Sequence, residues 1–418
     1  MPVSNVPQDP RANRKAYRYV LAWAAPCLSV LVALCSFGWS VTGQEPADKQ
    51  QRPRRVIDGE GKSTATQKPA IEEVGEDDVV RVDTQLVSVP AIVTNSLGRP
   101  LAGLRPENFF VYEDGQRQAI ANFGTADAPF EIALLLDTSG STRADVDLIR
   151  QAANAFIGAL RPGDRVAVVA FNTKVQGSSS LAAVDVLSNL TGDRKALRAA
   201  IENLGSSNGT PFYDALKRIA SEVFRELPAK EVRGRRAVVA LTDGVDSTSG
   251  SDYAEARDRL LHAGVACYFI EVNTEDFVED RLLKDCEDDG RLTLSARQLQ
   301  RYQRIFVPKG NSADYANFCQ LGQFERMQIS RDLYNLARRE MNDLARASGA
   351  RNFTAASLQD ARSAFASVAA DIGTQYSLGY YPTNKARDGK YRAIRVEVRG
   401  LKEKSDVHAR EGYYAPKR

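Results

Sequence analysis

Four apolar runs, each of the length of a β-strand, dominate the middle of the chain. They lie at residues 132–136, 166–171, 237–241 and 265–272. Amphipathic patterns of helical period separate them, at residues 146–160 and 212–227. Strands that are apolar on both faces need cover on both faces, so this alternation predicts a doubly wound, mostly parallel α/β sheet between helix layers. Residues 352–354 and a helix over residues 358–372 would complete this domain.

Strand patterns also flank the predicted α/β region on both sides. Asp114-Gly115 is a strong two-residue hairpin signal between strands near residues 109–112 and 118–123. Further strand patterns lie at residues 376–381, 394–398 and 407–414. Neither flank has enough strands for independent stability, so we expect them to pair in one β-sandwich that carries the α/β domain as an insertion. The expected boundaries are 79–128 plus 374–418 for the sandwich and 129–373 for the α/β domain.

The N-terminal segment has the layout of an export signal. Four basic residues precede an uncharged run over residues 19–39, which predicts a signal peptide or a signal anchor within residues 1–43. Residues 44–78 are poor in large apolar side chains and are expected to form a disordered linker. Whether residues 1–43 are cleaved off or stay as an anchor, the body of the protein would be extracytoplasmic: periplasmic, secreted or anchored to the cell envelope by one membrane segment.

Charge and histidine content exclude several classes of function. The net charge of +3 arises within residues 1–43, so the rest of the chain is balanced and offers no basic surface for nucleic acid. Only His262 and His408 are available, which leaves few routes to a zinc site with several imidazoles or to a Ser-His-Asp relay.

Hydroxyl and carboxylate side chains follow the predicted strands where a parallel sheet binds ligands. Asp137, Ser139 and Ser141 come after the first apolar run, Thr210 precedes a helix, and Asp243 comes after the third run. An all-oxygen set of two carboxylates and three hydroxyls suits a hard divalent cation, Mg²⁺ or Mn²⁺.

These residues resemble the metal-ion-dependent adhesion site (MIDAS) of von Willebrand factor type A (VWA) domains. The family motif, Asp-x-Ser-x-Ser with a distant Thr and a distant Asp in a Thr-Asp-Gly setting, is matched by Asp137, Ser139, Ser141, Thr210 and Asp243. The resemblance covers about residues 129–373. It implies a metal-dependent adhesion or protein-interaction module, not an enzyme, in which an acidic side chain of the partner completes the coordination of the cation.

The flanking strands resemble a narrower group, the bacterial secreted proteins described as VWFA-related. The segments that carry this resemblance are residues 109–115, 378–382 and 411–414.

Two alternatives to the binding function remain open. In the first, Asp137 is the nucleophile of a metal-assisted phosphatase or hydrolase, although Ser139 stands where such a site would want a second Asp. In the second, the domain is a scaffold with a vestigial metal site. Asp246 and Ser247 are expected to form a solvated turn near the site.

A long connection after the strand at 265–272 departs from the family pattern. Residues 274–330 intervene before the next expected helix, and such a length is often functional, so we consider both a lid or specificity surface beside the metal and a surface excursion without a role. Cys286 and Cys319 lie in this insertion and could form a disulfide in an oxidising compartment. Cys267 is expected to be a buried core thiol.

Overall fold

The computed structural model describes residues 86–125, 128–140, 145–177, 179–228, 232, 235–283 and 294–417. The predicted export segment (1–43), the predicted linker (44–78), Ser141 and Cys286 lie outside the described residues.

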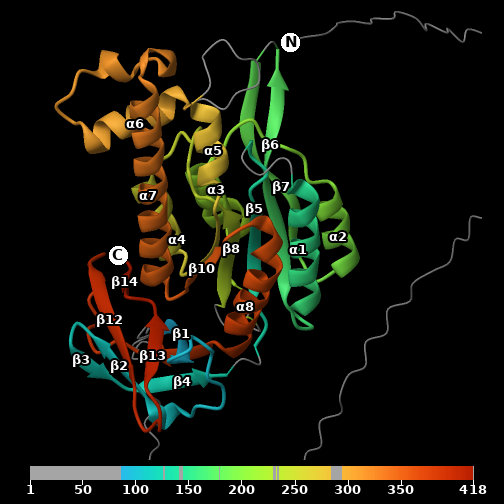
Figure 1. Ribbon diagram of the computed structural model, residues 1–418. Helices are drawn as coiled ribbons and strands as arrows, with labels where there is room; N and C mark the ends of the chain where they lie inside the picture. The colour runs from blue at the N-terminus through green and yellow to red at the C-terminus, as the bar shows by residue number, and fades with distance from the viewer. Residues whose placement is uncertain are drawn as a thin grey trace, which may run out of the picture. The chain divides into compact units, whose positions relative to one another are not determined.

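A six-stranded sheet forms the centre of the α/β domain (Figure 1). Its strand order is β10-β9-β8-β5-β6-β7, and every pair is parallel except β6 with β7. The strands are β5 (Glu131–Leu136), β6 (Arg165–Gln176), β7 (Ser179–Thr191), β8 (Arg236–Thr242), β9 (Ala266–Val272) and β10 (Asn352–Ala355). The predicted mostly parallel α/β sheet is confirmed. The edge strand β7 was not predicted, because Ser, Asp and Asn interrupt its apolar residues and most of the strand is only partly buried, unlike the central strands.

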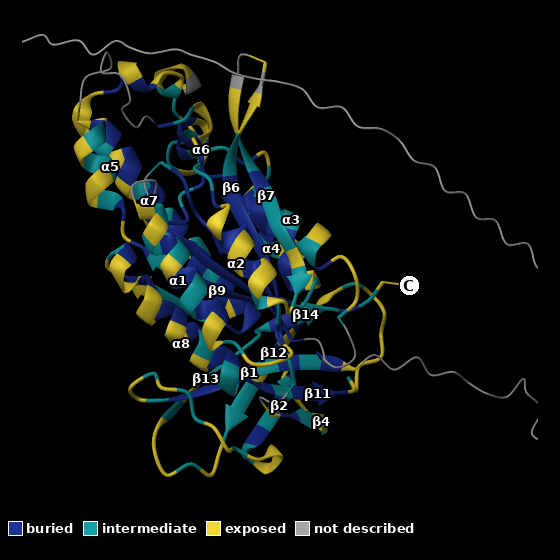
Figure 2. Ribbon diagram, turned by 90° about the vertical axis from the view of Figure 1, so that its right-hand side faces the viewer, coloured by how far each residue is buried: buried dark blue, intermediate teal, exposed yellow. Residues whose placement is uncertain are grey.

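Helices cover both faces of this sheet, and each face has its own apolar core (Figure 2). One core joins the sheet to α1, α2 and α8 through side chains such as Phe156 and Phe365, and the other joins it to α3, α4 and α7 through Phe212 and Met341. The helices are α1 (Val146–Ala159), α2 (Arg194–Glu202), α3 (Phe212–Arg218), α4 (Tyr253–His262), α7 (Gln323–Ser348) and α8 (Ala361–Thr374). Cys267 is free and buried in the second core, as expected.

The helix expected over residues 212–227 is shorter than predicted. The α-helical part ends at Arg218, and Ile219–Val223 continue as a π-helical segment, η4. Short 3₁₀ segments are η2 (Pro106–Asn108), η6 (Ser312–Tyr315), η7 (Phe318–Gln320) and η8 (Leu358–Asp360).

Strands from both ends of the described chain pair in two four-stranded antiparallel sheets. One sheet has the order β13-β1-β11-β4 and the other β14-β12-β2-β3. Their strands are β1 (Val87–Asn95), β2 (Phe109–Glu113), β3 (Gln116–Gln118), β4 (Ile120–Gly124), β11 (Tyr376–Tyr380), β12 (Tyr391–Val398), β13 (Ser405–Ala409) and β14 (Gly412–Tyr414). Val89, Val111, Leu378 and Ile394 from the two sheets share one buried core. The predicted sandwich of N-terminal and C-terminal strands is therefore confirmed.

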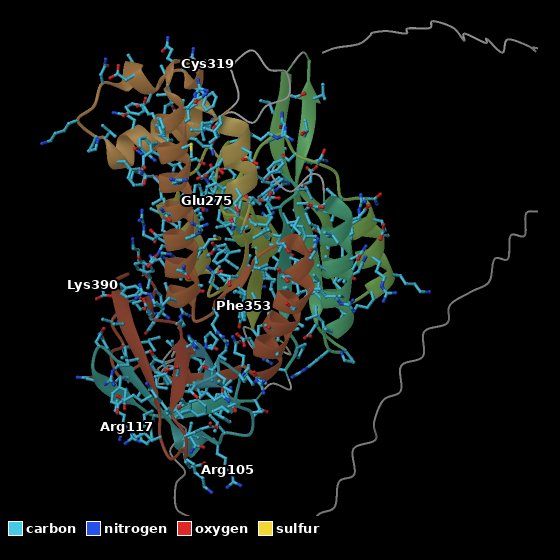
Figure 3. The ribbon with its side chains drawn as sticks, in the orientation of Figure 1. Arg105, Arg117, Glu275, Cys319, Phe353 and Lys390 are labelled. Atoms are coloured by element: carbon cyan, nitrogen blue, oxygen red, sulfur yellow. The ribbon has the colours of Figure 1, made fainter. Side chains whose placement is uncertain are left out.

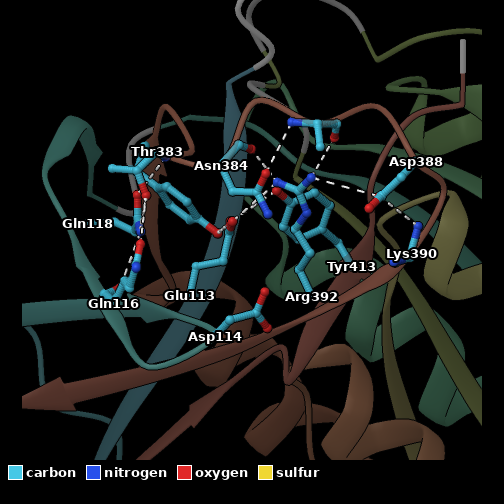
Figure 4. A network of polar contacts seen from close by, with 12 residues as sticks. Glu113, Asp114, Gln116, Gln118, Thr383, Asn384, Asp388, Lys390, Arg392 and Tyr413 are labelled. Carbon is cyan, nitrogen blue, oxygen red and sulfur yellow. Dashed lines mark hydrogen bonds and ion pairs between the residues drawn. The ribbon is translucent and has the colours of Figure 1, made fainter.

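A buried polar cluster lies within this sandwich (Figure 4). Glu113 is 2% exposed, forms an ion pair with Arg392 at 3.3 Å, and accepts hydrogen bonds from the hydroxyls of Tyr380 (2.6 Å) and Tyr413 (3.0 Å). Arg392 also donates to the carbonyls of Asn384 and Ala386. The cluster joins both halves of the sandwich, because Glu113 comes from the N-terminal strands and the other residues from the C-terminal part.

The insertion after β9 contains helices that the sequence pattern did not predict. They are α5 (Glu275–Leu282) and α6 (Ala296–Phe306), and α7 begins at Gln323. Leu299, Tyr302, Phe318 and Leu333 belong to a separate small core. Figure 3 shows Cys319 at the end of the α/β domain farthest from Arg105 and Arg117 of the sandwich, with Glu275 between them.

Cys319 is disulfide-bonded, and the predicted pairing with Cys286 stays a prediction because Cys286 is not described. In the described part of the chain, no helix is both long enough and apolar enough to cross a membrane.

Candidate metal site

Two adjacent strands end at the predicted ligands. In the parallel pair of β5 and β8, Leu136 lies opposite Leu241, so Asp137 and Thr242-Asp243 leave the sheet side by side. The backbone nitrogen of Asp137 donates to the carbonyl of Leu241 at 3.0 Å. The carboxyl ends of both strands therefore bring the two predicted carboxylates to one place, where open α/β sheets bind ligands.

The carboxylate of Asp137 is oriented by hydrogen bonds on both oxygens. Its Oδ1 accepts from the backbone nitrogen of Ser139 at 3.0 Å, and its Oδ2 accepts from the hydroxyl of Thr242 at 2.7 Å. The Ser139 side chain is also hydrogen-bonded to Asp137. Asp137 and Ser139 are 1% and 3% exposed. These bonds hold the carboxylate in a fixed direction at the edge of the sheet.

The loop that carries Thr210 is hydrogen-bonded to the loop of Asp137 and to the loop of Asp243. The backbone nitrogen of Ser207 donates to the carbonyl of Thr138 at 2.8 Å. The backbone nitrogen of Thr210 donates to Oγ of Ser247 at 2.7 Å, and the Thr210 carbonyl accepts from the backbone nitrogen of Ser247 at 3.0 Å. Thr210 is buried, and backbone bonds fix its position between the loops of Asp137 and Asp243.

Asp243 is held by a chain of hydroxyl groups. Its Oδ1 accepts from the backbone nitrogen of Val245 at 3.1 Å, and its Oδ2 accepts from the hydroxyl of Thr274 at 2.7 Å. The hydroxyls of Thr274 and Tyr334 are also 2.7 Å apart. Because the Thr274 proton goes to Asp243, Tyr334 donates to Thr274. Thr274 and Tyr334 were not predicted as site residues, and no local pattern distinguishes them from other hydroxyl side chains.

Two buried carboxylates so close together disfavour a double negative charge. Burial raises the pKa of Asp137 to about 7, and the negative charge of Asp243 raises it in the same direction. Hydrogen bonds from Thr242 and Ser139 act to lower the pKa of Asp137. A pKa raised in this way is the expected signature of carboxylates that share one site, and a divalent cation between them would relieve the repulsion.

The expected solvated turn at Asp246 and Ser247 is wrong. Asp246 is 6% exposed and accepts from the backbone nitrogens of Tyr213 (3.2 Å) and Ser249 (3.1 Å), and burial raises its pKa to about 6. Oγ of Ser247 accepts a hydrogen bond from the backbone nitrogen of Thr210. Asp246 is buried and Ser247 half-buried because α3 and the insertion pack over the turn, which is a tertiary effect that the local sequence does not contain.

The residues fit a hard cation in donor chemistry. Asp137 and Ser139 are in contact, Asp243 is close enough to raise the pKa of Asp137, and all three carry oxygen donors. Within the described ranges, no group of three or more His, Cys, Asp and Glu side chains is arranged to hold a metal, so a metal here must use hydroxyl groups as well. Ser141 lies outside the described residues, and metal binding by the five residues stays a prediction.

The sequence model of the von Willebrand factor type A domain family matches residues 131–296. Residues 131–296 form a VWA domain. The match begins at β5 and ends at the start of α6, so it includes the loops of Asp137, Thr210 and Asp243. VWA domains are commonly protein-interaction modules without enzymatic activity, and they often bind a divalent metal at a MIDAS.

Several solved structures resemble this chain at low sequence identity and low TM-score. Proximal thread matrix protein 1 from the mussel byssus is 14% identical, with a TM-score of 0.38 over 66% of this chain and 51% of that chain. A zinc-occupied MIDAS form of the same protein is 20% identical, with a TM-score of 0.30 over 36% and 38% of the two chains. A von Willebrand factor type A protein from Catenulispora acidiphila is 13% identical, with a TM-score of 0.36 over 80% and 74%.

The chain spans about half the length of the mussel protein chains that it matches. No curated protein sequence matches the chain.

Proposed function

We propose that this protein is an extracytoplasmic interaction or adhesion module that binds an acidic side chain of a partner protein through Mg²⁺ or Mn²⁺. The residues that would hold the cation are Asp137, Ser139, Ser141, Thr210 and Asp243. The supporting observation is the meeting of Asp137 and Asp243 at the ends of adjacent strands, within loops that are hydrogen-bonded to one another. The N-terminal sequence pattern supports the extracytoplasmic location.

Neighbouring residues orient the two carboxylates of the proposed metal site. When bound, the cation would supply a positive centre that attracts a carboxylate of the partner. Thr242 and the backbone of Ser139 orient Asp137, while Thr274 orients Asp243. Such outer hydrogen bonds fix the direction of ligand oxygens and so contribute to metal affinity.

The arrangement supports binding over hydrolysis. A phosphatase would need Asp137 as a nucleophile, yet both of its carboxylate oxygens accept hydrogen bonds that fix the group in place, and Ser139 stands where a second carboxylate would act. Hydrolysis of a phosphate ester by the Mg²⁺-loaded protein, lost in Asp137→Ala, would favour the enzyme instead.

The insertion is proposed as the surface that selects the partner. At the start of α6, Ser295 donates through its hydroxyl to the carbonyl of Ser247 at 2.6 Å, and Arg297 donates to the carbonyl of Ser249 at 2.7 Å. A pocket of about 620 Å³ lies between α6 and the loop after β8, with Tyr213, Asp246, Arg301 and Arg304 in its lining. Tyr213 and Asp246 lie three residues beyond Thr210 and Asp243, so the pocket is built on the same two segments that carry these proposed ligands.

The first experiment is calorimetric titration of the chain with Mg²⁺ and with Mn²⁺. We expect binding at one site in the wild type and none in Asp137→Ala. Asp147→Ala is the matched control, because Asp147 is an exposed aspartate on α1 that is not a proposed ligand. Equal binding by Asp137→Ala and the wild type would contradict the proposed site, and absence of binding in the wild type would favour the vestigial scaffold.

The second experiment tests the partner contact. Cation-dependent capture from the envelope of the producing cell should recover a protein with Mg²⁺ but not with chelator, and not with Asp137→Ala. Charge reversal at exposed Arg304 should weaken this capture, whereas Arg362→Glu on α8 should not. Undiminished capture by Arg304→Glu would remove the proposed role of the insertion while leaving the metal site intact.

A further inference from the structure

A second cleft lies between α7 and the sandwich, and no proposed metal ligand takes part in it. Its volume is about 850 Å³. Arg339 and Arg346 of α7 line one side, Arg395 of β12 and His408 of β13 line the other, and Arg351 and Arg410 complete the wall. The metal-binding proposal leaves this cleft unexplained.

The two walls are joined by contacts at one end of the cleft. The backbone nitrogen of Glu411 donates to the carbonyl of Ala347 at 3.2 Å, and Arg351 donates to the carbonyl of Gly98 at 3.1 Å. Gly349 ends α7 at φ +80°, and a Cβ atom there would collide with the backbone of Arg410. The cleft is therefore bounded by a close and specific contact between the α/β domain and the sandwich.

Positive charge dominates the lining. Asp343 and Glu411 are the acidic residues in it, and Arg346 lies within 3.3 Å of a carboxylate oxygen of each. Arg351 pairs with buried Asp371, and Arg395 pairs with Glu397. Among the described residues, no carboxylate forms an ion pair with Arg339 or Arg410. Two arginines of the cleft therefore have no anionic partner in the described part of the chain.

The contacts of Arg410 with other described residues are all to neutral groups. Its guanidinium donates to the carbonyl of Gly412 at 3.0 Å and lies over the ring of Tyr413. Burial lowers the pKa of Arg410, because little water remains to solvate its charge. Arg410 is half-buried, so its charge has lost part of its hydration, and an anionic group entering the cleft would offset that cost.

The cleft also exposes backbone groups at the edge of β13. This strand is the outermost of its sheet, and Val93 of β1 lies opposite Val407. The Val93 carbonyl accepts from the backbone nitrogen of Leu101, on the side of β1 away from β13. Facing residues of an antiparallel pair point their polar groups either both inward or both outward, so the N–H and C=O of Val407 point away from β1. Such an open edge can pair with an additional strand.

A segment of β12 presents a second open edge in the same cleft. The carbonyl of Ala393 accepts from the backbone nitrogen of Asp114 on the side of β2, and the nitrogen of Ile394 donates to the carbonyl of Glu411 on the other side. By alternation, Val396 directs its backbone groups away from β2, as Ile394 does. Both Val396 and Val407 line the cleft.

We propose that this cleft binds an extended, acidic segment of a partner protein, which adds to the edge of β13 as a strand. Backbone pairing with Val407 supplies affinity for an extended chain, and Arg339, Arg395 and Arg410 select carboxylates. Opposite charge on the segment is required, because a neutral or basic segment would leave Arg410 without compensation. The proposal is independent of the metal site.

The test measures binding of a fluorescent peptide of about ten residues, alternating Glu and Thr, to the full chain in the presence of a chelator. We expect binding that weakens with salt and is unchanged in Asp137→Ala, whereas a Lys-Thr peptide does not bind. The double variant Arg339→Glu/Arg395→Glu should lose about tenfold or more in affinity, equivalent to ~1.4 kcal/mol. Arg198→Glu, at an exposed arginine of α2, should bind as the wild type does.

Two further measurements separate strand addition from simple attraction of anions. Methylation of alternate peptide nitrogens should abolish binding, and the bound peptide should slow hydrogen exchange at the Val407 amide. Equal binding by the double variant and the wild type would overturn the proposal. So would full binding of the methylated peptide, or displacement by inorganic polyphosphate without protection of Val407, because those results describe a polyanion site.

Discussion

The hydroxyl of Thr274 donates a hydrogen bond to Oδ2 of Asp243 at 2.7 Å, and Tyr334 in turn donates to Thr274. Thr274 stands where the insertion leaves β9, and Tyr334 lies on α7, where the chain returns from it. One predicted metal ligand is thus held by residues from both ends of the insertion. This contact gives the insertion a direct connection to the site.

Loss of this bond should weaken metal binding without removing a ligand. We expect Thr274→Val to lower Mn²⁺ affinity about 10- to 100-fold, as loss of an orienting outer bond does at other metal sites. Thr274→Ser keeps the hydroxyl and should retain affinity, and Tyr334→Phe should give a smaller loss. Calorimetric titration measures all three, and an unchanged affinity in Thr274→Val would show that Asp243 needs no such support.

The pH dependence of stability should report the ion pair of Arg351 and Asp371. Burial raises the pKa of Asp371 to about 6, although Arg351 acts to lower it. The folded state therefore binds a proton more tightly than the unfolded state does, and the free energy of unfolding should fall as the pH rises from about 4 to about 6. The contribution of this group is at most about 3 kcal/mol.

Denaturant unfolding of the wild type and of Asp371→Asn across this range isolates that contribution. The difference in unfolding free energy between the two proteins should change between pH 4 and pH 6 and be constant at lower pH. Asp276→Asn, at an exposed aspartate of α5, should show no such change. A constant difference for Asp371→Asn throughout would mean that Asp371 titrates as it does in water.

The contact at the end of α7 should tolerate no side chain. Gly349 has φ +80°, and an added Cβ would meet the backbone of Ala409 and Arg410. We expect Gly349→Ala to reduce the unfolding free energy by about 2 kcal/mol or more, through both backbone strain and collision. Gly158→Ala is the control, because Gly158 lies in α1 with open space around it. This variant should have a slightly higher unfolding free energy than the wild type. Thermal unfolding compares the two variants.

The buried cluster at Glu113 should stabilise the sandwich as a unit. Glu113→Ala would leave Arg392 buried without its carboxylate, and we expect a loss of about 3–5 kcal/mol. Glu107→Ala, at an exposed position of η2, should change stability little. The midpoint of denaturant unfolding measures both, and a loss below about 1 kcal/mol for Glu113→Ala would indicate that water replaces the carboxylate.

The central fold was predictable because the strands β5, β6, β8 and β9 are apolar runs bounded by polar residues, and burial on two faces demands that composition. Asp137 and Asp243 could be placed for the same reason, since each follows directly on such a run. The strand β7 and the helices α5 and α6 could not, because their residues are half-exposed and their pattern is shared with loops.

The sequence alone determined the buried strands of the central sheet, the pairing of the two flanks in a sandwich, and the oxygen-bearing residues at the strand ends. These follow from local periodicity and from where polar residues interrupt apolar runs. Only the tertiary structure decided that Asp246 is buried, that Thr274 and Tyr334 support Asp243, and that Arg410 lines a cleft in which no described carboxylate pairs with it. Those facts depend on packing between segments far apart in the chain, and no local pattern encodes which side chain a distant segment will cover.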